Sequence, residues 1–139
     1  MTKKDDDVNS VLKDDGVKNI DLTNFQNKSS VSIKDIELKL GSNNSWATRV
    51  TYNKDFGGVL IQQMPGEGNR MHLHPNAAEA WYIVKGKWKW FIDKEGEKIV
   101  EEGSIINVKA NTLHQITCIG DEPGLRLAIT VPDVMHVYK

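Results

Sequence analysis

Cysteine is almost missing from this chain: Cys118 is the only one in 139 residues, so no internal disulfide can form. An excess of charge of one sign is also missing, because 18 Lys and Arg stand against 19 Asp and Glu. That balance excludes the strongly basic surface typical of nucleic-acid-binding domains. No apolar run is long enough to cross a bilayer, and the first residues form no apolar leader. We therefore expect a cytoplasmic protein with neither a nucleic-acid nor a membrane partner.

The composition is otherwise that of a globular protein, with 39% hydrophobic and 27% charged residues. A length of 139 residues is typical of one domain with a sizeable core. Residues 1–17 differ from the rest, because they are rich in charge and have little to bury. We expect residues 1–17 to be a flexible polar arm and residues 18–139 to form a single domain.

Short apolar segments separated by Gly, Pro, Asn and Asp turns run through most of the chain. The clearest are residues 46–52, 59–64, 80–85, 87–92 and 125–131. Residues 29–40 alternate in the same way with one slip in register, which favours a strand with a bulge. No segment is a convincing helix. This pattern predicts an all-β fold, a sandwich or a barrel.

Two histidines one residue apart, His72 and His74, dominate the middle of the chain. On a strand they point to the same face, and Glu79 begins the next strand after a Pro-Asn turn. Two imidazoles and a carboxylate on paired strands form three sides of a metal site. His114, in another apolar run, is the candidate fourth ligand, whereas His136 near the end of the sequence is interpreted as a surface histidine.

The spacing of these residues resembles the first motif of the cupin superfamily, G-x5-H-x-H-x4-E-x6-G. Every spacing is met by Gly66, His72, His74, Glu79 and Gly86. The resemblance implies a double-stranded β-helix, the cupin jelly-roll barrel, with His72, His74, Glu79 and His114 as metal ligands inside it. It does not imply one reaction, since this fold carries many activities.

The second cupin motif, G-x5-P-x-G-x2-H-x3-N, is matched less completely. Gly103 and His114 stand in their places. Lys109 replaces the proline, Asn111 the second glycine and Cys118 the final asparagine. Asn tolerates the left-handed backbone that a glycine usually supplies there. The departures therefore affect the turn and the edge of the motif, not its metal ligand.

Strand alternation suggests which side chains accompany the ligands. Arg70 shares the parity of His72 and is a candidate anchor for an anionic group. Trp81 shares the parity of Glu79 and is a candidate wall of the pocket. One of two adjacent glutamines must face inward, and Gln62 is the third candidate catalytic residue.

Other parities point to packing. Trp88 and Trp90 share a face and are expected to fill the barrel. Met71 and Leu73 point away from the ligand face. Such an apolar face predicts a homodimer, or else cover by the chain's own N-terminal strands.

Three imidazoles and a carboxylate suit one divalent ion per chain: Fe, Mn, Ni, Co or Zn. The favoured hypothesis is an enzyme acting on a small polar or anionic metabolite, either a sugar derivative or a hydroxy or keto acid. Its chemistry would be redox-neutral, of isomerase, epimerase or lyase type. A non-haem iron dioxygenase is the alternative, and a non-catalytic cupin that binds a small ligand is the second alternative.

Overall fold

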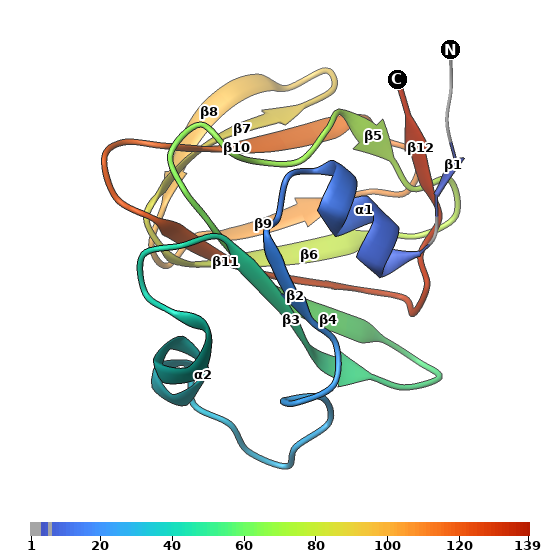
Figure 1. The fold of residues 1–139 in the computed structure, drawn as a ribbon. Helices are drawn as coiled ribbons and strands as arrows, with labels where there is room; N and C mark the ends of the chain where they lie inside the picture. The colour runs from blue at the N-terminus through green and yellow to red at the C-terminus, as the bar shows by residue number, and fades with distance from the viewer. Residues whose placement is uncertain (1–3, 6) are drawn as a thin grey trace.

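The structure is a computed structural model, and it describes residues 4–5 and 7–139. Two six-stranded sheets face each other (Figure 1). The first sheet has the order β1 (Lys4–Asp5), β12 (His136–Tyr138), β5 (His72–Leu73), β10 (His114–Ile119), β7 (Lys87–Ile92), β8 (Gly96–Glu101). The second has the order β2 (Asn19–Asp21), β3 (Trp46–Tyr52), β4 (Gly57–Gln63), β11 (Gly124–Thr130), β6 (Glu79–Lys85), β9 (Ile105–Val108). The mostly-β architecture predicted from the sequence is confirmed.

Large side chains from both sheets fill the interior. On β6, Trp81 and Ile83 are buried on the same face as Glu79, as their parity predicts. On β7, Trp88 and Trp90 are buried and belong to the same core cluster as Trp81. The prediction that Trp88 and Trp90 fill the barrel is confirmed, and the rings of Trp81 and Trp90 both lie close to that of His114, at 6.3 and 5.7 Å between centres.

The strand expected within residues 29–40 is wrong, because residues 33–40 form helix α2 (Ile33–Leu40). The Ser32 side chain caps it by accepting a hydrogen bond of 3.1 Å from the Asp35 N–H. Ile36 and Leu40, one turn apart, are buried against Trp46 on the outer face of the second sheet. The slip in register within residues 29–40 is the change from the two-residue spacing of a strand to the three- and four-residue spacing of a helix.

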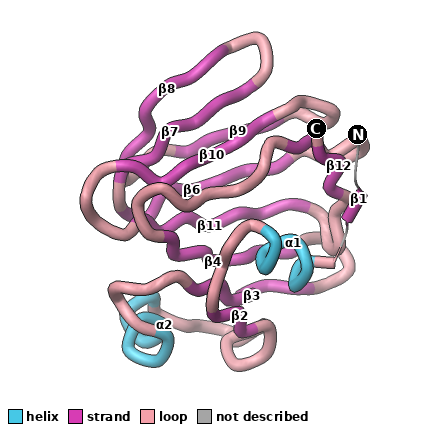
Figure 2. The backbone as a smooth tube through the Cα atoms, turned by 45° about the horizontal axis from the view of Figure 1, so that its top comes forward, coloured by secondary structure: helices cyan, strands magenta, loops and turns pink. Residues whose placement is uncertain are grey.

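A second helix, α1 (Val8–Asp14), lies where the composition predicts a flexible arm. Figures 1 and 2 show it bridging the open side of the barrel, between β12 of one sheet and β4 of the other. Val11 and Leu12 are buried, and Leu12 packs with Ala47 and Ile61. The expectation that this segment buries little is therefore wrong for residues 8–14. Residues 1–3 and 6 of the expected arm lie outside the described part.

The chain passes very close to β10 at Gly68, which bridges to Thr117. A Cβ atom at residue 68 would collide with the backbone of Ile116 and Thr117. We expect Gly68→Ala to lower the free energy of unfolding by about 2 kcal/mol, because the backbone cannot yield as a side chain can. Denaturant titration checks this, with Gly58→Ala as the control, where the nearest atoms would lie 3.6 Å away. Equal losses in the two variants would contradict the prediction.

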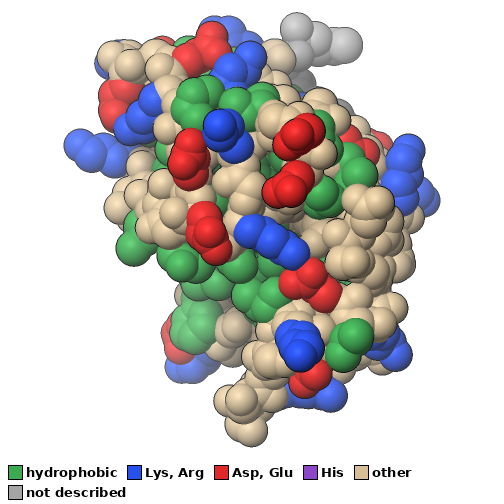
Figure 3. All heavy atoms as spheres, turned by 90° about the vertical axis from the view of Figure 1, so that its left-hand side faces the viewer, with side chains coloured by type: hydrophobic (Ala, Val, Ile, Leu, Met, Phe, Trp, Pro, Cys, Tyr) green, Lys and Arg blue, Asp and Glu red, His purple; other side chains and the backbone are tan. Residues whose placement is uncertain are grey.

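The surface has no dominant charge on the face drawn in Figure 3, where acidic, basic and hydrophobic side chains are interspersed. Tyr82, Ile105 and Ile129 are exposed apolar residues on the outer side of the second sheet, and Tyr82 lies opposite Ile105. They offer a contact surface, and the homodimer stays a prediction. Among the described helices, none is long and apolar enough to span a membrane.

Candidate metal centre

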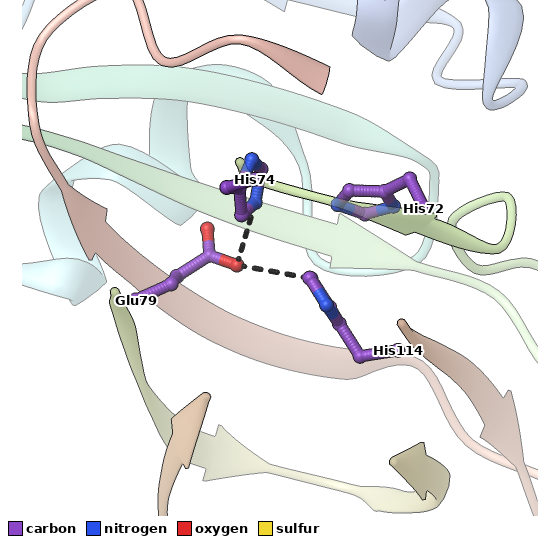
Figure 4. A group of neighbouring side chains, drawn as sticks. All are labelled: His72, His74, Glu79 and His114. Carbon is purple, nitrogen blue, oxygen red and sulfur yellow. Dashed lines mark hydrogen bonds and ion pairs between the residues drawn. The ribbon is translucent and has the colours of Figure 1, made fainter. Parts of the chain in front are cut away.

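The four residues of the predicted site meet between the two sheets. His72 on β5 pairs directly with His114 on β10, and His74 follows β5 by one residue. Glu79 reaches the same point from β6 in the opposite sheet (Figure 4). All four are buried, and their ligand atoms lie within 4.8 Å of one another. The sequence-predicted ligands are therefore brought together.

Backbone carbonyls fix the orientation of the three imidazoles. The Nδ1 atom of each ring lies close to a carbonyl oxygen: 2.7 Å to Arg70 for His72, 2.9 Å to Met135 for His74 and 2.8 Å to Thr112 for His114. Because a carbonyl only accepts, each Nδ1 carries the proton and donates it. When a ring is neutral, its Nε2 lone pair is then available to a cation.

Glu79 is held as a carboxylate by its neighbours. Its Oε1 lies 3.2 Å from Nε2 of His74 and 3.4 Å from Nε2 of His114. Burial alone would raise its pKa, but the contacts with His114 and His74 outweigh burial and hold the pKa of Glu79 well below its usual value. The site thus contains one fixed negative charge.

The histidines respond to the same surroundings. Burial, aided by the nearby His114, lowers the pKa of His72 to about 2, so this ring is neutral at every ordinary pH. Burial also opposes the charge on His74, yet its contact with Glu79 leaves its pKa raised. Nε2 of His114 is buried and makes no well-aligned hydrogen bond within the described part of the chain. A buried lone pair directed at a carboxylate fits a site that can hold a cation.

The donor set fits a divalent ion of borderline softness. Imidazole nitrogen suits Fe, Ni, Cu and Zn, and the carboxylate also accepts Mn. An ion that prefers six ligands would use these four and keep two positions for small molecules. One divalent ion per chain therefore fits His72, His74, Glu79 and His114.

A pocket opens beside this cluster, and α1 forms part of its wall. It is lined by His72, Glu79 and Trp81, by Val8 and Leu12 of α1, and by apolar residues of β4 and β11. The α1 residues Val8, Val11 and Leu12 and the C-cap residue Asp15 recur at helical spacing, so one face of the helix meets the pocket. This spacing is the sequence signal that could have identified α1 as part of the site.

Arg70, the predicted anion anchor, is engaged elsewhere. Its Nε lies 2.6 Å from Oδ1 of Asp15, and its Nη2 donates to the Tyr138 hydroxyl at 2.9 Å. The guanidinium also stacks on the Tyr138 ring, 3.9 Å from its centre. Arg70 precedes the short strand β5, so the alternation that suggested its direction does not extend to it. Its contacts hold α1 on the barrel and do not favour its role as an anchor.

Arg49 and Arg126 both line the pocket, and Arg126 is the buried one of the two. Arg126 lies on β11, is only 2% exposed, and stacks on Trp81 with its Cζ 4.4 Å from the ring centre. Its Nε and Nη2 donate to Oε1 of Gln63 at 3.2 and 2.9 Å. The sequence contains a signal that Arg126 is unusual, because it is a charged residue between Leu125 and Leu127 in a mostly apolar strand.

The two glutamines of β4 face opposite ways. Gln62, the predicted candidate, is buried on the outer side of the sheet, where Nε2 donates to the carbonyls of Gly41 and Asn44. Gln63 faces inward and contacts Arg126. Gln62 therefore lies outside the pocket lining, whereas Trp81 lies in it as expected.

His136 is not the surface histidine that the sequence suggested. Its ring centre lies 4.9 Å from that of His72 and 4.6 Å from that of His74, and it lines the pocket. β12 pairs with β5 and so carries His136 to the ligand pair. Because pairing of these distant strands decides the position, no local pattern could have predicted it.

Comparisons with known proteins agree with this geometry. A family model described as the cupin domain matches residues 59–130. No significant match was found among curated proteins. The fold resembles that of an uncharacterised Klebsiella pneumoniae protein with a double-stranded β-helix domain, at a TM-score of 0.64 and 19% identity over 76% of this chain and 87% of that one.

Two further solved structures are similar. KdgF from Halomonas sp. matches with a TM-score of 0.57 and 16% identity, covering 62% of this chain and 78% of that one. A protein from Acidithiobacillus ferrooxidans, proposed to be a sugar phosphate isomerase, matches with a TM-score of 0.52 and 26% identity, covering 55% of this chain and half of the other. With its two facing sheets, buried His/His/Glu/His cluster and matched family model, the chain belongs to the cupin family.

Proposed function

We propose that this cupin is a metal-dependent enzyme that acts on a small polar or anionic metabolite by redox-neutral chemistry, as an isomerase, epimerase or lyase does. The observation that carries the proposal is the convergence of His72, His74, Glu79 and His114 beside a pocket. Buried ionisable groups are costly unless they are paired or coordinated. Their placement at the wall of a pocket favours a working site over a purely structural one.

A bound divalent ion would supply Lewis acidity, polarising a carbonyl or hydroxyl of the substrate. The residues of the chain would do the rest. Glu79 and the three histidines would hold the ion, and the backbone carbonyls that contact the histidines keep their rings oriented. Trp81 and the apolar residues of α1 exclude water from the pocket. The similarity to the Acidithiobacillus protein, proposed to be a sugar phosphate isomerase, supports the isomerase form of the proposal.

Elemental analysis of protein purified without added metal is the first test. We expect about one divalent ion per chain. Turnover of a panel of hydroxy acids, keto acids and sugar derivatives is then followed by NMR, under nitrogen and under air, together with oxygen uptake by the iron form.

Conversion that proceeds equally under nitrogen supports the proposal. Conversion only under air, with oxygen uptake, would replace it with the dioxygenase alternative. Binding of substrates without conversion in any metal form would leave the non-catalytic alternative. If the protein binds none of Fe, Mn, Ni, Co and Zn after dialysis against each ion, the proposal is wrong, because it depends on a bound metal.

A further inference from the structure

Arg126 carries a buried charge that the described part of the chain does not neutralise. Its only hydrogen bonds there go to the neutral Oε1 of Gln63, through Nε and Nη2. A guanidinium has five N–H donors, so three remain for another acceptor. The charges of Asp15 and Glu79 act on it, but neither carboxylate is among its hydrogen-bond partners in the described part of the chain. A buried charge without a counter-ion is costly, and this cost suggests a ligand that supplies one.

A second unused donor lies in the same wall. Nε1 of Trp81 is buried and has no acceptor among the described residues. The guanidinium of Arg126 stacks on the face of this indole, and the Trp81 ring in turn lies 6.3 Å, centre to centre, from that of His114. The wall therefore joins Arg126 to the ligand cluster. The Arg126 guanidinium and the Trp81 indole N–H both donate hydrogen bonds, so a ligand that binds to this wall must accept them.

The charges in the pocket favour a negative acceptor. Asp15 is paired with Arg70 at 2.6 Å, so that pair has no net charge. Glu79, the acidic partner of His114, contributes one negative charge, which one divalent ion would exceed. Arg49 and Asp133 also line the pocket, and their opposite charges offset each other. Arg126 then adds a further positive charge. Burial lowers the pKa of Arg126 to about 10, which leaves it charged at neutral pH.

We infer that Arg126 and Trp81 form a binding site for the carboxylate of a small-molecule ligand whose other end faces His72 and Glu79. This inference deepens the proposed function and rests on it for the role of the ligand as substrate. Gln63 accepts from the edge of the guanidinium formed by Nε and Nη2, so the edge formed by the two Nη atoms remains for a ligand. A planar carboxylate can accept from such an edge with both of its oxygens.

A phosphate fits this wall less well. It would direct further charged oxygens at Val59, Ile61 and Ala128, which line the pocket and offer no side-chain donor. It would also add a second negative charge near the carboxylates of Asp15 and Glu79. The predicted ligand class is therefore a small monocarboxylate, such as a hydroxy or keto acid.

Titration with propionate tests the inference, because propionate has a carboxylate and no second group to chelate a metal. Calorimetry gives its affinity for the full-length protein, both metal-free and metal-loaded, and NMR follows the indole N–H signals. We expect propionate to bind and to shift one indole signal, which Trp81→Phe removes. We expect Arg126→Lys, which keeps the charge but not the fork, to weaken binding roughly 10- to 100-fold.

Two further variants keep the test independent of any folding defect. Gln63→Glu, nearly identical in shape, places a competing carboxylate against Arg126 and should also weaken propionate binding at least ~10-fold. Lys89→Gln removes an exposed positive charge and should leave the affinity unchanged. Melting curves confirm that each variant is folded at the temperature of the titration.

Unchanged propionate affinity in folded Arg126→Lys and Gln63→Glu would overturn the inference. So would tighter binding of inorganic phosphate than of propionate, or loss of propionate binding in Arg49→Gln alone. Protein that binds metal but no propionate would overturn the inference and leave the proposed function standing. Protein that binds propionate through Arg126 but takes up no metal would support the carboxylate site and contradict the proposed function.

Discussion

Replacing His114 with alanine is expected to leave the protein with far less than one metal ion per chain. The variant loses one of four ligands, and its Glu79 must then share a cation with His72 and His74 alone. Changes to residues that only orient a ligand weaken metal binding by ~10–100-fold, so loss of a ligand itself should exceed that range. Elemental analysis after dialysis measures the stoichiometry, and competition with a chelator measures the affinity.

His136→Ala is the matched control for this prediction. It also removes an imidazole from the pocket, one whose ring contacts those of His72 and His74. Its side chain lies outside the cluster that could hold an ion, so the stoichiometry should stay near one ion per chain. Full metal content in His114→Ala, or equal losses in both variants, would show that the fourth ligand has been misassigned.

The ligand set could be predicted from the sequence because its geometry is local. A single residue separates His72 from His74, and Glu79 begins the next strand after a short loop, so strand alternation predicts the direction of all three. His114 required the spacing of the second motif. That spacing holds despite Asn111, whose φ of 61° is the left-handed backbone that a glycine would otherwise supply.

The residues that surround the four ligands could not be predicted in the same way. The predicted direction of the Arg70 side chain rests on strand alternation. The strand β5 has only two residues and begins after Arg70, so alternation does not apply to the irregular segment that contains it. Arg126 and His136 reach the pocket through pairings of β11 and β12 with strands more than forty residues away. Sequence alone does not state those pairings.

The two helices were missed for a different reason. Each is seven or eight residues long, too short to display several turns of periodicity. In α2 the alternating apolar residues before Ile36 imitate a strand. In α1, Val8, Val11 and Leu12 share one face, but the charged residues around them make this apolar pattern hard to recognise in the sequence. Packing against the barrel, rather than local propensity, stabilises both.

Replacing Arg70 with methionine is expected to destabilise the protein by about 3 kcal/mol at pH 7. The change leaves the buried carboxylate of Asp15 without its partner, and removing one member of a buried ion pair costs ~3–5 kcal/mol. The lower end applies because the Arg70 side chain is 33% exposed. Denaturant titration gives the free energy of unfolding, and proteolysis within α1 reports whether the helix leaves the barrel.

The loss should depend on pH in a defined direction. Burial raises the pKa of Asp15 above 3.8, and Arg70 partly offsets this effect, so removing Arg70 should raise the pKa of Asp15 further. A raised pKa in the folded state gives stability that is complete below pH 3.8 and is lost as pH rises through the folded value. The difference between variant and wild type should therefore be largest at pH 7 and should narrow towards pH 4.

Two controls separate the ion pair from general damage at this position. Lys89→Met removes an exposed pair with Glu97 and should cost less than about 0.5 kcal/mol. Combining Asp15→Asn with Arg70→Met removes both charges, so it should recover part of the stability that Arg70→Met loses. If the double variant is no more stable than Arg70→Met, or if the loss does not change with pH, then Arg70 acts through its packing on Tyr138. The charge of Asp15 would then have no part in holding α1 over the pocket.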